Sequence, residues 1–190
     1  MKLDAKKIAG IGLLTAIVVV LQLFLRIKFG TFDIATTLVP IVIGAALYGK
    51  AVGAWLGFVF GMTVLLSGDA TLFLGINPLG TVETVLLKGA LAGLAAGAVY
   101  QALEKRSKFG AAVCAAITAP VVNTGIFLRG CYLFFLPSIK EMAEAAHAAR
   151  ADVFIFTTFI GLNFILEFSI NLVLASTITR LIDVLQKRMR

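Results

Sequence analysis

Long apolar runs separated by short polar segments make up most of the chain. One membrane crossing needs about 20 apolar residues. The runs therefore predict transmembrane helices near 6–25, 33–49, 51–67, 81–103, 110–136 and 153–184. The first run is too long for the core of a signal peptide, and no A-x-A cleavage site follows it. The pattern predicts an all-α membrane protein, a single domain over residues 1–190 that forms a six-helix bundle.

Composition and motifs narrow the function further. The chain is 60% apolar and 14% charged, whereas soluble domains are about 45–50% apolar and 25% charged. Its basic residues lie at the ends of apolar runs rather than among exposed aromatics, which argues against nucleic-acid binding despite a net charge of +7. The two cysteines lack metal-ligand spacing, and no phosphate loop, HExxH or GxSxG motif occurs. We therefore predict no enzymatic activity, no cofactor and no metal site.

The distribution of Lys and Arg favours cytoplasmic termini, because cytoplasmic loops of membrane proteins carry more positive charge. In this orientation eleven basic residues fall inside and four outside. The inner set is Lys2, Lys6, Lys7, Lys50, Lys105, Arg106, Lys108, Arg180, Lys187, Arg188 and Arg190. The outer set is Arg26, Lys28, Lys140 and Arg150. The protein is thus expected to be a multi-pass plasma-membrane protein of a bacterial cell, with the lipid bilayer around it.

Small residues recur at helical spacing, as expected where membrane helices pack closely. One series is Gly49, Gly53, Gly57 and Gly61, and another is Gly89, Gly93 and Gly97. A third, near the start of the first helix, is Ala5, Ala9, Gly12 and Ala16. Such series serve internal packing or contact with a partner protein.

Polar residues inside the predicted spans are the candidates for solute binding, since a charged group in a span usually faces the bundle interior, a partner or a water-filled cavity. The candidates are Glu83, Lys88, Asn123, Arg129, Asn163 and Glu167. Each also has a structural explanation: Arg129 could reach the headgroups or pair with Glu83, Lys88 could pair with Glu167, and the asparagines could bond neighbouring helices. Their convergence from the fourth, fifth and sixth spans on the outer half favours a solute pocket.

Several segments together resemble the substrate-binding S components of energy-coupling factor (ECF) vitamin transporters. They are LVPIVIGAALYGKAVGAWLGFVFG, GTVETVLLKGALAGLAAGAVY, APVVNTGIFLRG and LNFILEFSINLVL, in that order. The resemblance implies a six-helix protein that captures a micronutrient and delivers it through a transmembrane coupling protein and two cytoplasmic ATPases. It also implies that Ala5, Ala9, Gly12 and Ala16 meet the coupling protein, and that loops around 26–34 and 67–80 close the pocket.

The substrate suggested by these features is pantothenate. Lys88, Arg129, Asn123 and Asn163 suit a small hydroxylated carboxylate, and the segment around PVVNTG looks closest to the pantothenate branch of the family. Glu83 and Glu167 would equally suit a cationic solute such as thiamine, a pyridoxine vitamer or a queuosine precursor. Two other classes stay open: a stand-alone proton-coupled secondary transporter that uses the two glutamates, and a structural membrane subunit that binds no solute.

Overall fold

The computed structural model describes residues 5–24, 27–29, 32–34 and 36–189. Its elements, including two π-helical segments η1 and η2, are α1 (Ala5–Phe24), β1 (Ile27–Phe29), β2 (Phe32–Ile34), α2 (Leu38–Tyr48), α3 (Lys50–Leu66), α4 (Thr71–Ile76), α5 (Pro78–Leu103), α6 (Lys108–Gly130), η1 (Cys131–Phe135), α7 (Leu136–Ala145), α8 (Ala151–Phe154), η2 (Ile155–Ile160) and α9 (Gly161–Met189). The predicted helical class is confirmed for these residues, apart from a short hairpin of β1 and β2.

Each predicted span coincides with a helix or a run of joined helices. By length and apolar composition, three described segments are able to cross a membrane: α1, α5 and the continuous run 108–145. A fourth is the pair 151–160 and 164–174, which is bent by 44°. The apolar helices α2 and α3 are shorter, at 11 and 17 residues. The second predicted span began too early, because its first residues form β2 and a turn instead of helix.

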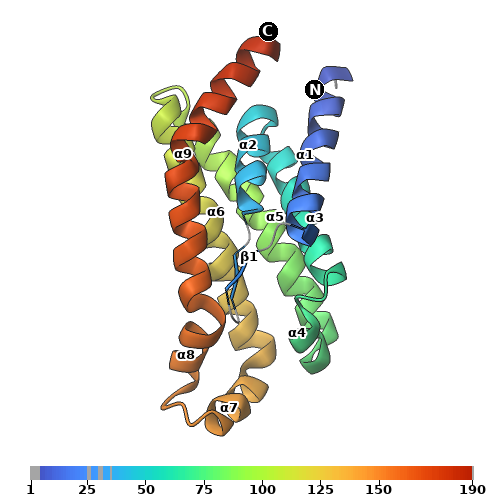
Figure 1. Ribbon diagram of the computed structural model, residues 1–190, viewed down its shortest axis with the longest axis vertical. Coiled ribbons are helices and arrows are strands. Elements are labelled where there is room, and N and C mark those ends of the chain that lie inside the picture. The colour runs from blue at the N-terminus through green and yellow to red at the C-terminus, as the bar shows by residue number, and fades with distance from the viewer. Residues whose placement is uncertain (1–4, 25–26, 30–31, 35, 190) are drawn as a thin grey trace.

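Both ends of the described bundle lie on the same side. The start of α1 and the end of α9 are neighbours at the top of Figure 1, together with the α2–α3 and α5–α6 junctions. This end carries the described basic residues Lys6, Lys7, Lys50, Lys105, Arg106, Lys108 and Arg180. Lys2, Arg26 and Arg190 lie outside the described residues. The α7 end carries Lys140 and Arg150, as the predicted charge distribution requires.

Helices α3 and α5 touch backbone to backbone along a seam of glycines. A Cβ atom added to Gly57 would overlap the carbonyl oxygen of Gly89, and one on Gly53 would overlap that of Gly93. At the far end of the seam, a Cβ on Gly61 would lie 2.7 Å from the carbonyl oxygen of Val85. In lipid, such close approach supplies the van der Waals contact that holds helices together. The packing role predicted for these glycines is therefore confirmed.

The length of α2 leaves room inside the bundle. Eleven residues of α-helix extend about 16 Å, and α2 fills only the half of the bundle nearer the termini (Figure 1). In that half an alanine-rich core joins α2, α5, α6 and α9, including Ala96, Ala112 and Ala116. Beyond the start of α2 no described helix runs through the centre, and the interior is lined by side chains from the surrounding helices.

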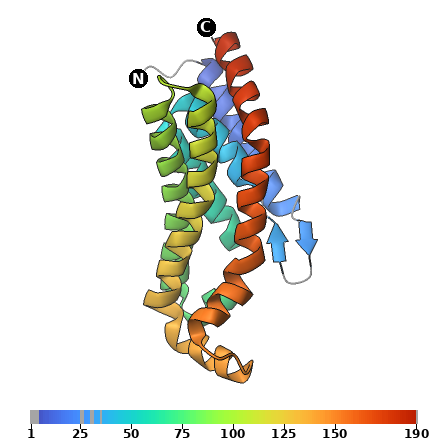
Figure 2. The same ribbon diagram turned by 90° about the vertical axis from the view of Figure 1, so that its left-hand side faces the viewer.

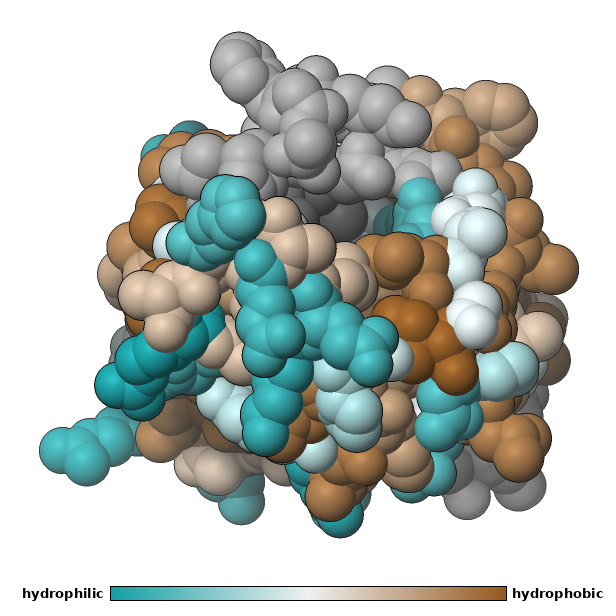
Figure 3. All heavy atoms as spheres, turned by 90° about the horizontal axis from the view of Figure 1, so that it is seen from below, coloured by the Kyte–Doolittle hydropathy of each residue, from teal (hydrophilic) through white to brown (hydrophobic). Residues whose placement is uncertain are grey.

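The opposite end of the bundle is closed by aromatic and amphipathic segments. Phe135 in η1 packs with Ile139 in α7 and with Ile155 and Ile160 in η2. Seen from this end, hydrophilic side chains gather on the face while the flanks are largely apolar (Figure 3). The β1–β2 hairpin projects from the side of the bundle and contacts α9 through β2 (Figure 2). The polar segment after Pro137 is helical as far as Ala145, the last residue of α7.

Candidate functional site

A cavity of about 300 Å³ lies among α1, α3, α4, α5, α6, η2 and α9. It is bordered by the N-terminal end of α2, because the Thr37 hydroxyl at that end donates a hydrogen bond to Gln22, which lines the cavity. The described lining residues are Gln22, Phe60, Val64, Asp69, Ala70, Leu72, Phe73, Val85, Lys88, Asn123, Thr124, Phe127, Thr158, Phe159, Ile160, Phe164 and Glu167. A mostly apolar lining with a few polar groups is typical of a small-molecule site.

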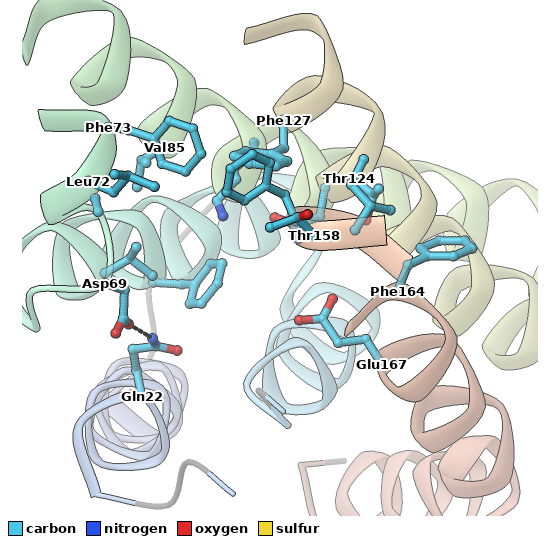
Figure 4. Close-up of a pocket in the computed structure, with 17 residues that line it drawn as sticks. Gln22, Asp69, Leu72, Phe73, Val85, Thr124, Phe127, Thr158, Phe164 and Glu167 are labelled. Carbon is cyan, nitrogen blue, oxygen red and sulfur yellow. Dashed lines mark hydrogen bonds between the residues drawn. The ribbon is translucent and has the colours of Figure 1, made fainter. Parts of the chain in front are cut away.

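Three of the residues predicted from the sequence meet in this cavity: Lys88 from α5, Asn123 from α6 and Glu167 from α9. Figure 4 shows the Glu167 carboxylate pointing from α9 into the space between the helices. Lys88 and Glu167 attract each other electrostatically across the cavity but form no direct ion pair within the described part of the chain. Neither side chain is therefore neutralised by a direct ion pair with a described residue.

Lys88 is held against aromatic rings. Its Nζ atom lies 5.4 Å from the ring centroid of Phe127 and 5.9 Å from that of Phe60. A cation within about 6 Å of an aromatic face is attracted by the negative face of the ring. Lys88 adjoins Gly89 of the α3–α5 seam, so the seam fixes the backbone from which this ammonium projects.

Asn123 is the buried amide of the site. It lies one turn beyond Pro120 in α6, which continues through the proline to Gly130. The Asn123 side chain is only 7% exposed, and its Oδ1 atom has no hydrogen-bond partner among the described residues. An unsatisfied buried acceptor costs free energy unless a ligand or water supplies a donor. Asn123 is thus poised to accept a hydrogen bond from a bound solute.

Another polar residue of the last predicted span, Asn171, lies one turn after Glu167 in α9. Asn171 is fully buried, and its Nδ2 atom donates to the backbone oxygen of Glu167 at 2.8 Å. This bond stays within α9, so Asn171 does not join helices through it. Asn163 lies one turn before Glu167 in α9, but its side chain is outside the described part of the structure.

Arg129 and Glu83 do not line the cavity. Both side chains are exposed on the outside of the bundle, towards the α4 and α7 end. Neither forms an ion pair with a described residue, so the pairing considered for them from the sequence is absent there. Arg129 lies in the last turn of α6, from which its long side chain can reach the membrane interface.

A polar network that no sequence pattern predicted lies on the α1 side of the cavity. Gln22 is 3% exposed, and its Nε2 atom donates to Asp69 Oδ2 at 2.8 Å (Figure 4). The same carboxylate oxygen accepts from the Ser67 hydroxyl at 2.7 Å, and Gln22 Oε1 accepts from Thr37 at 3.2 Å. The only signal was an amide near the end of an apolar helix, since Asp69 is 47 positions away.

Removing this network is expected to destabilise the protein. Gln22→Leu deletes the buried donor to Asp69 and the acceptor for Thr37, and losing a hydrogen bond to a charged group costs about 1.5–3 kcal/mol. For a chain of this size that corresponds to a fall of roughly 3–12 °C in melting temperature. Thermal unfolding of the purified variant in detergent measures this fall in melting temperature. Exposed Gln101→Leu on α5 is the control and should melt like wild type; an equal fall in both variants would contradict the role of the network.

A cluster of aromatic side chains is a second feature that no sequence pattern predicted. Phe73 of α4 contacts Phe127, Phe135 and Phe159 with ring centroids 5.5, 4.9 and 5.3 Å apart. The phenylalanines are dispersed over the chain, so periodicity gave no hint that they would converge. The loop region 67–80, predicted to close the pocket, contributes four lining residues through Asp69, Ala70, Leu72 and Phe73.

The small-residue series on α1 faces outward. Ala5, Ala9, Gly12 and Ala16 are all exposed, and a Cβ atom on Gly12 would meet nothing within 4 Å. Larger apolar side chains beside them are exposed as well, among them Leu13 and Phe24. This series therefore differs from the α3–α5 glycines, because no described part of the chain packs on it.

Comparisons with known proteins agree with this architecture. A family model described as "ECF transporter, substrate-specific component" matches residues 6–182. The chain is also similar to the pantothenic acid transporter PanT of Lactococcus lactis subsp. cremoris (strain MG1363), with 29% identity over 157 residues; the match covers 73% of this chain and 79% of PanT. No solved structure matches the chain. Its apolar helices make it a multi-pass protein of the plasma membrane. Because the family match spans α1 to α9, the chain belongs to the substrate-specific components of ECF transporters, which are transporter subunits and not enzymes.

Proposed function

We propose that this protein is the substrate-binding subunit of an ECF vitamin importer and that it captures pantothenate from outside the cell. The observation that carries the proposal is the cavity in which Lys88, Asn123 and Glu167 converge beyond the start of α2. The similarity to PanT supports the choice of substrate. The protein would hand its substrate to a transmembrane coupling protein driven by two cytoplasmic ATPases.

The topology we propose has six crossings and cytoplasmic termini, in one membrane domain. The residues before α2 together with α2 contribute one of the crossings and α3 another, because α2 alone extends about 16 Å and the hydrocarbon core is about 30 Å thick. The excess of basic residues at the end with the α1 start and the α9 end supports this orientation. The cavity then lies in the half of the bundle nearer the outside, where a substrate-capturing subunit needs it. The outward-facing small residues of α1, including Ala9 and Gly12, would form the surface for the coupling protein.

The polar groups of the cavity match a hydroxylated carboxylate with an amide. Lys88 provides a positive charge, while Asn123 and Glu167 provide hydrogen-bond acceptors for hydroxyl or amide donors. Thr124 and Thr158 add hydroxyl groups. The apolar rings complete a pocket in which these polar interactions are partly shielded from water, which strengthens them.

A ligand panel tests this proposal. Small molecules released from detergent-purified protein are identified by mass spectrometry, and melting temperatures are measured with each vitamin. At 100 times its dissociation constant a ligand stabilises by about 2.7 kcal/mol, which is roughly 5–10 °C here. We expect this shift with pantothenate. Stabilisation by thiamine, a pyridoxine vitamer or a queuosine precursor alone would overturn the choice of substrate, and no stabilisation by any vitamin would favour a structural subunit.

Glu167→Gln distinguishes an anionic from a cationic substrate. The amide keeps an acceptor but removes a negative charge, so pantothenate affinity should hold or increase, whereas a cationic substrate would lose its counter-charge. Isothermal titration of the wild-type protein and of Glu167→Gln with the identified ligand measures the change in affinity. A strong loss of pantothenate affinity would contradict our assignment of Glu167.

Reconstitution separates the importer from a secondary transporter. Uptake into liposomes is expected to require the coupling protein, the ATPases and internal ATP. Uptake by the purified chain alone under a proton gradient would overturn the ECF mechanism and favour a secondary transporter, with Glu83 and Glu167 as the candidate proton-coupling groups.

A further inference from the structure

The Lys88 ammonium in the cavity has identifiable neighbours, which are two carboxylates and two aromatic rings. Among the described lining residues, Lys88 is the one with a cationic side chain. Of the two lining carboxylates, Asp69 already accepts hydrogen bonds from Gln22 and Ser67 on the α1 side. Glu167 projects from α9 and makes no direct ion pair with Lys88. The ammonium is therefore accessible to an anionic group of a ligand.

The two rings beside Lys88 restrict where its ammonium lies. Phe127 comes from α6 and Phe60 from α3, so the cation is attracted to faces on two different helices, at 5.4 and 5.9 Å. Phe127 is itself fixed by an edge-to-face contact with Phe73 of α4. A flexible lysine normally loses much side-chain entropy when it binds a ligand. Rings that hold the side chain beforehand reduce this loss.

We infer that Lys88 is the receptor for the carboxylate of the substrate, and that Phe127 and Phe60 are positioning residues that hold its ammonium in place. This inference rests on the proposed function and adds the orientation of the substrate. The carboxylate end lies against Lys88 on α5, where it replaces Glu167 as the counter-charge. The hydroxyl and amide groups then donate to Glu167 and to the unsatisfied Oδ1 atom of Asn123.

If Lys88 binds the carboxylate, the protein should bind pantothenate more tightly than the alcohol that lacks this group. The ratio of the two affinities therefore tests the role of Lys88. Pantothenate and the primary alcohol formed by reducing its carboxyl group differ at that group alone, so every other contact cancels in the ratio. A charged hydrogen bond in a partly dry site favours the acid by about 10- to 100-fold. The wild-type protein is expected to bind the acid more tightly by this factor in isothermal titration.

Variants at Lys88 and Phe127 then test the two roles. Lys88→Met should bring the ratio close to one while leaving the affinity for the alcohol nearly unchanged. Phe127→Leu removes a ring face and should lower the ratio by about three- to tenfold, whereas Phe127→Tyr retains the face and should restore it. Because a general packing defect weakens both ligands alike, it would not change the ratio.

Two control variants change the same residue types away from the cavity. Lys50→Met removes an exposed charge at the terminal end of α3, and Phe58→Leu changes an exposed ring on the same helix. Both should keep the wild-type ratio.

The possible results separate the inference from the proposed function. Tight binding of both ligands with equal affinity, or a ratio that survives Lys88→Met, would overturn the role of Lys88 while leaving pantothenate as the substrate. An unchanged ratio in Phe127→Leu would overturn the positioning role alone. Binding of neither ligand by the wild type would overturn the proposed substrate and the inference with it.

Discussion

Gly57→Ala is expected to lower the melting temperature of the purified protein by roughly 5–10 °C. The added methyl group would overlap the carbonyl oxygen of Gly89, which is backbone and cannot rotate away. The helices α3 and α5 would have to separate along the whole seam, with loss of the close contact that stabilises them in lipid. Because Lys88 adjoins Gly89, the variant should also bind its substrate more weakly. Thermal unfolding and titration measure the two effects.

Gly125→Ala provides the matched control. Gly125 lies within α6, and a Cβ atom there would meet nothing within 4 Å. Alanine is favoured over glycine in a helix by about 0.5–1 kcal/mol, so this variant should melt at the wild-type temperature or slightly above it. If Gly57→Ala had the same melting temperature as Gly125→Ala, the α3–α5 seam would tolerate a side chain, which would contradict the backbone contact between the two helices.

Gly12→Leu is expected to abolish uptake while leaving substrate affinity unchanged. The leucine side chain would extend from the exposed face of α1 into open space, so the isolated protein should fold normally. In the assembled importer it would keep the coupling protein from approaching α1. Loss of a central interface contact commonly costs 2 kcal/mol or more, or about 30-fold in affinity. Uptake into proteoliposomes and titration of the purified subunit measure the two quantities.

The same substitution at Gly125 controls for bulk on an exposed helix face. Gly125→Leu on α6 should retain uptake, because the proposed docking surface is on α1. Equal loss of uptake in both variants would show that leucine at any exposed position disturbs transport. Loss of substrate affinity in Gly12→Leu would place α1 in the binding step and contradict the division of roles between its two faces.

Local sequence patterns predicted the helices and the closest packing in this protein. Glycines four residues apart identify the α3–α5 seam, because only the absence of side chains permits contact between backbones. Lys88, Asn123 and Glu167 were identified because a polar group within a span is costly unless it faces the interior. The same argument also selected Arg129 and Glu83, but both are exposed on the bundle exterior. Both lie nearer the α4 and α7 end of the bundle than Lys88 and Asn123, the cavity residues on the same helices.

The remaining features depend on contacts between segments that lie far apart in the sequence. Gln22 and Asp69 are joined across 47 positions, and Phe73 meets rings from α6, η1 and η2. No local periodicity encodes such meetings. The hairpin of β1 and β2 is too short to produce a detectable alternation, at three residues per strand. The cavity itself follows from the length of α2, which a hydropathy pattern gives only approximately.

The α3–α5 seam also limits how the selectivity of this site can change during evolution. Along that seam backbone meets backbone, so substitutions at its glycines alter helix separation before they alter chemistry. Lys88 and Phe60 stand on this rigid support, while Asn123, Thr158 and Glu167 stand on helices outside it. Mutations that create a new ligand preference without loss of folding should therefore accumulate on α4, α6, η2 and α9. The half of the site on α3 and α5 should therefore change little, whereas the half on α4, α6, η2 and α9 can change its ligand specificity.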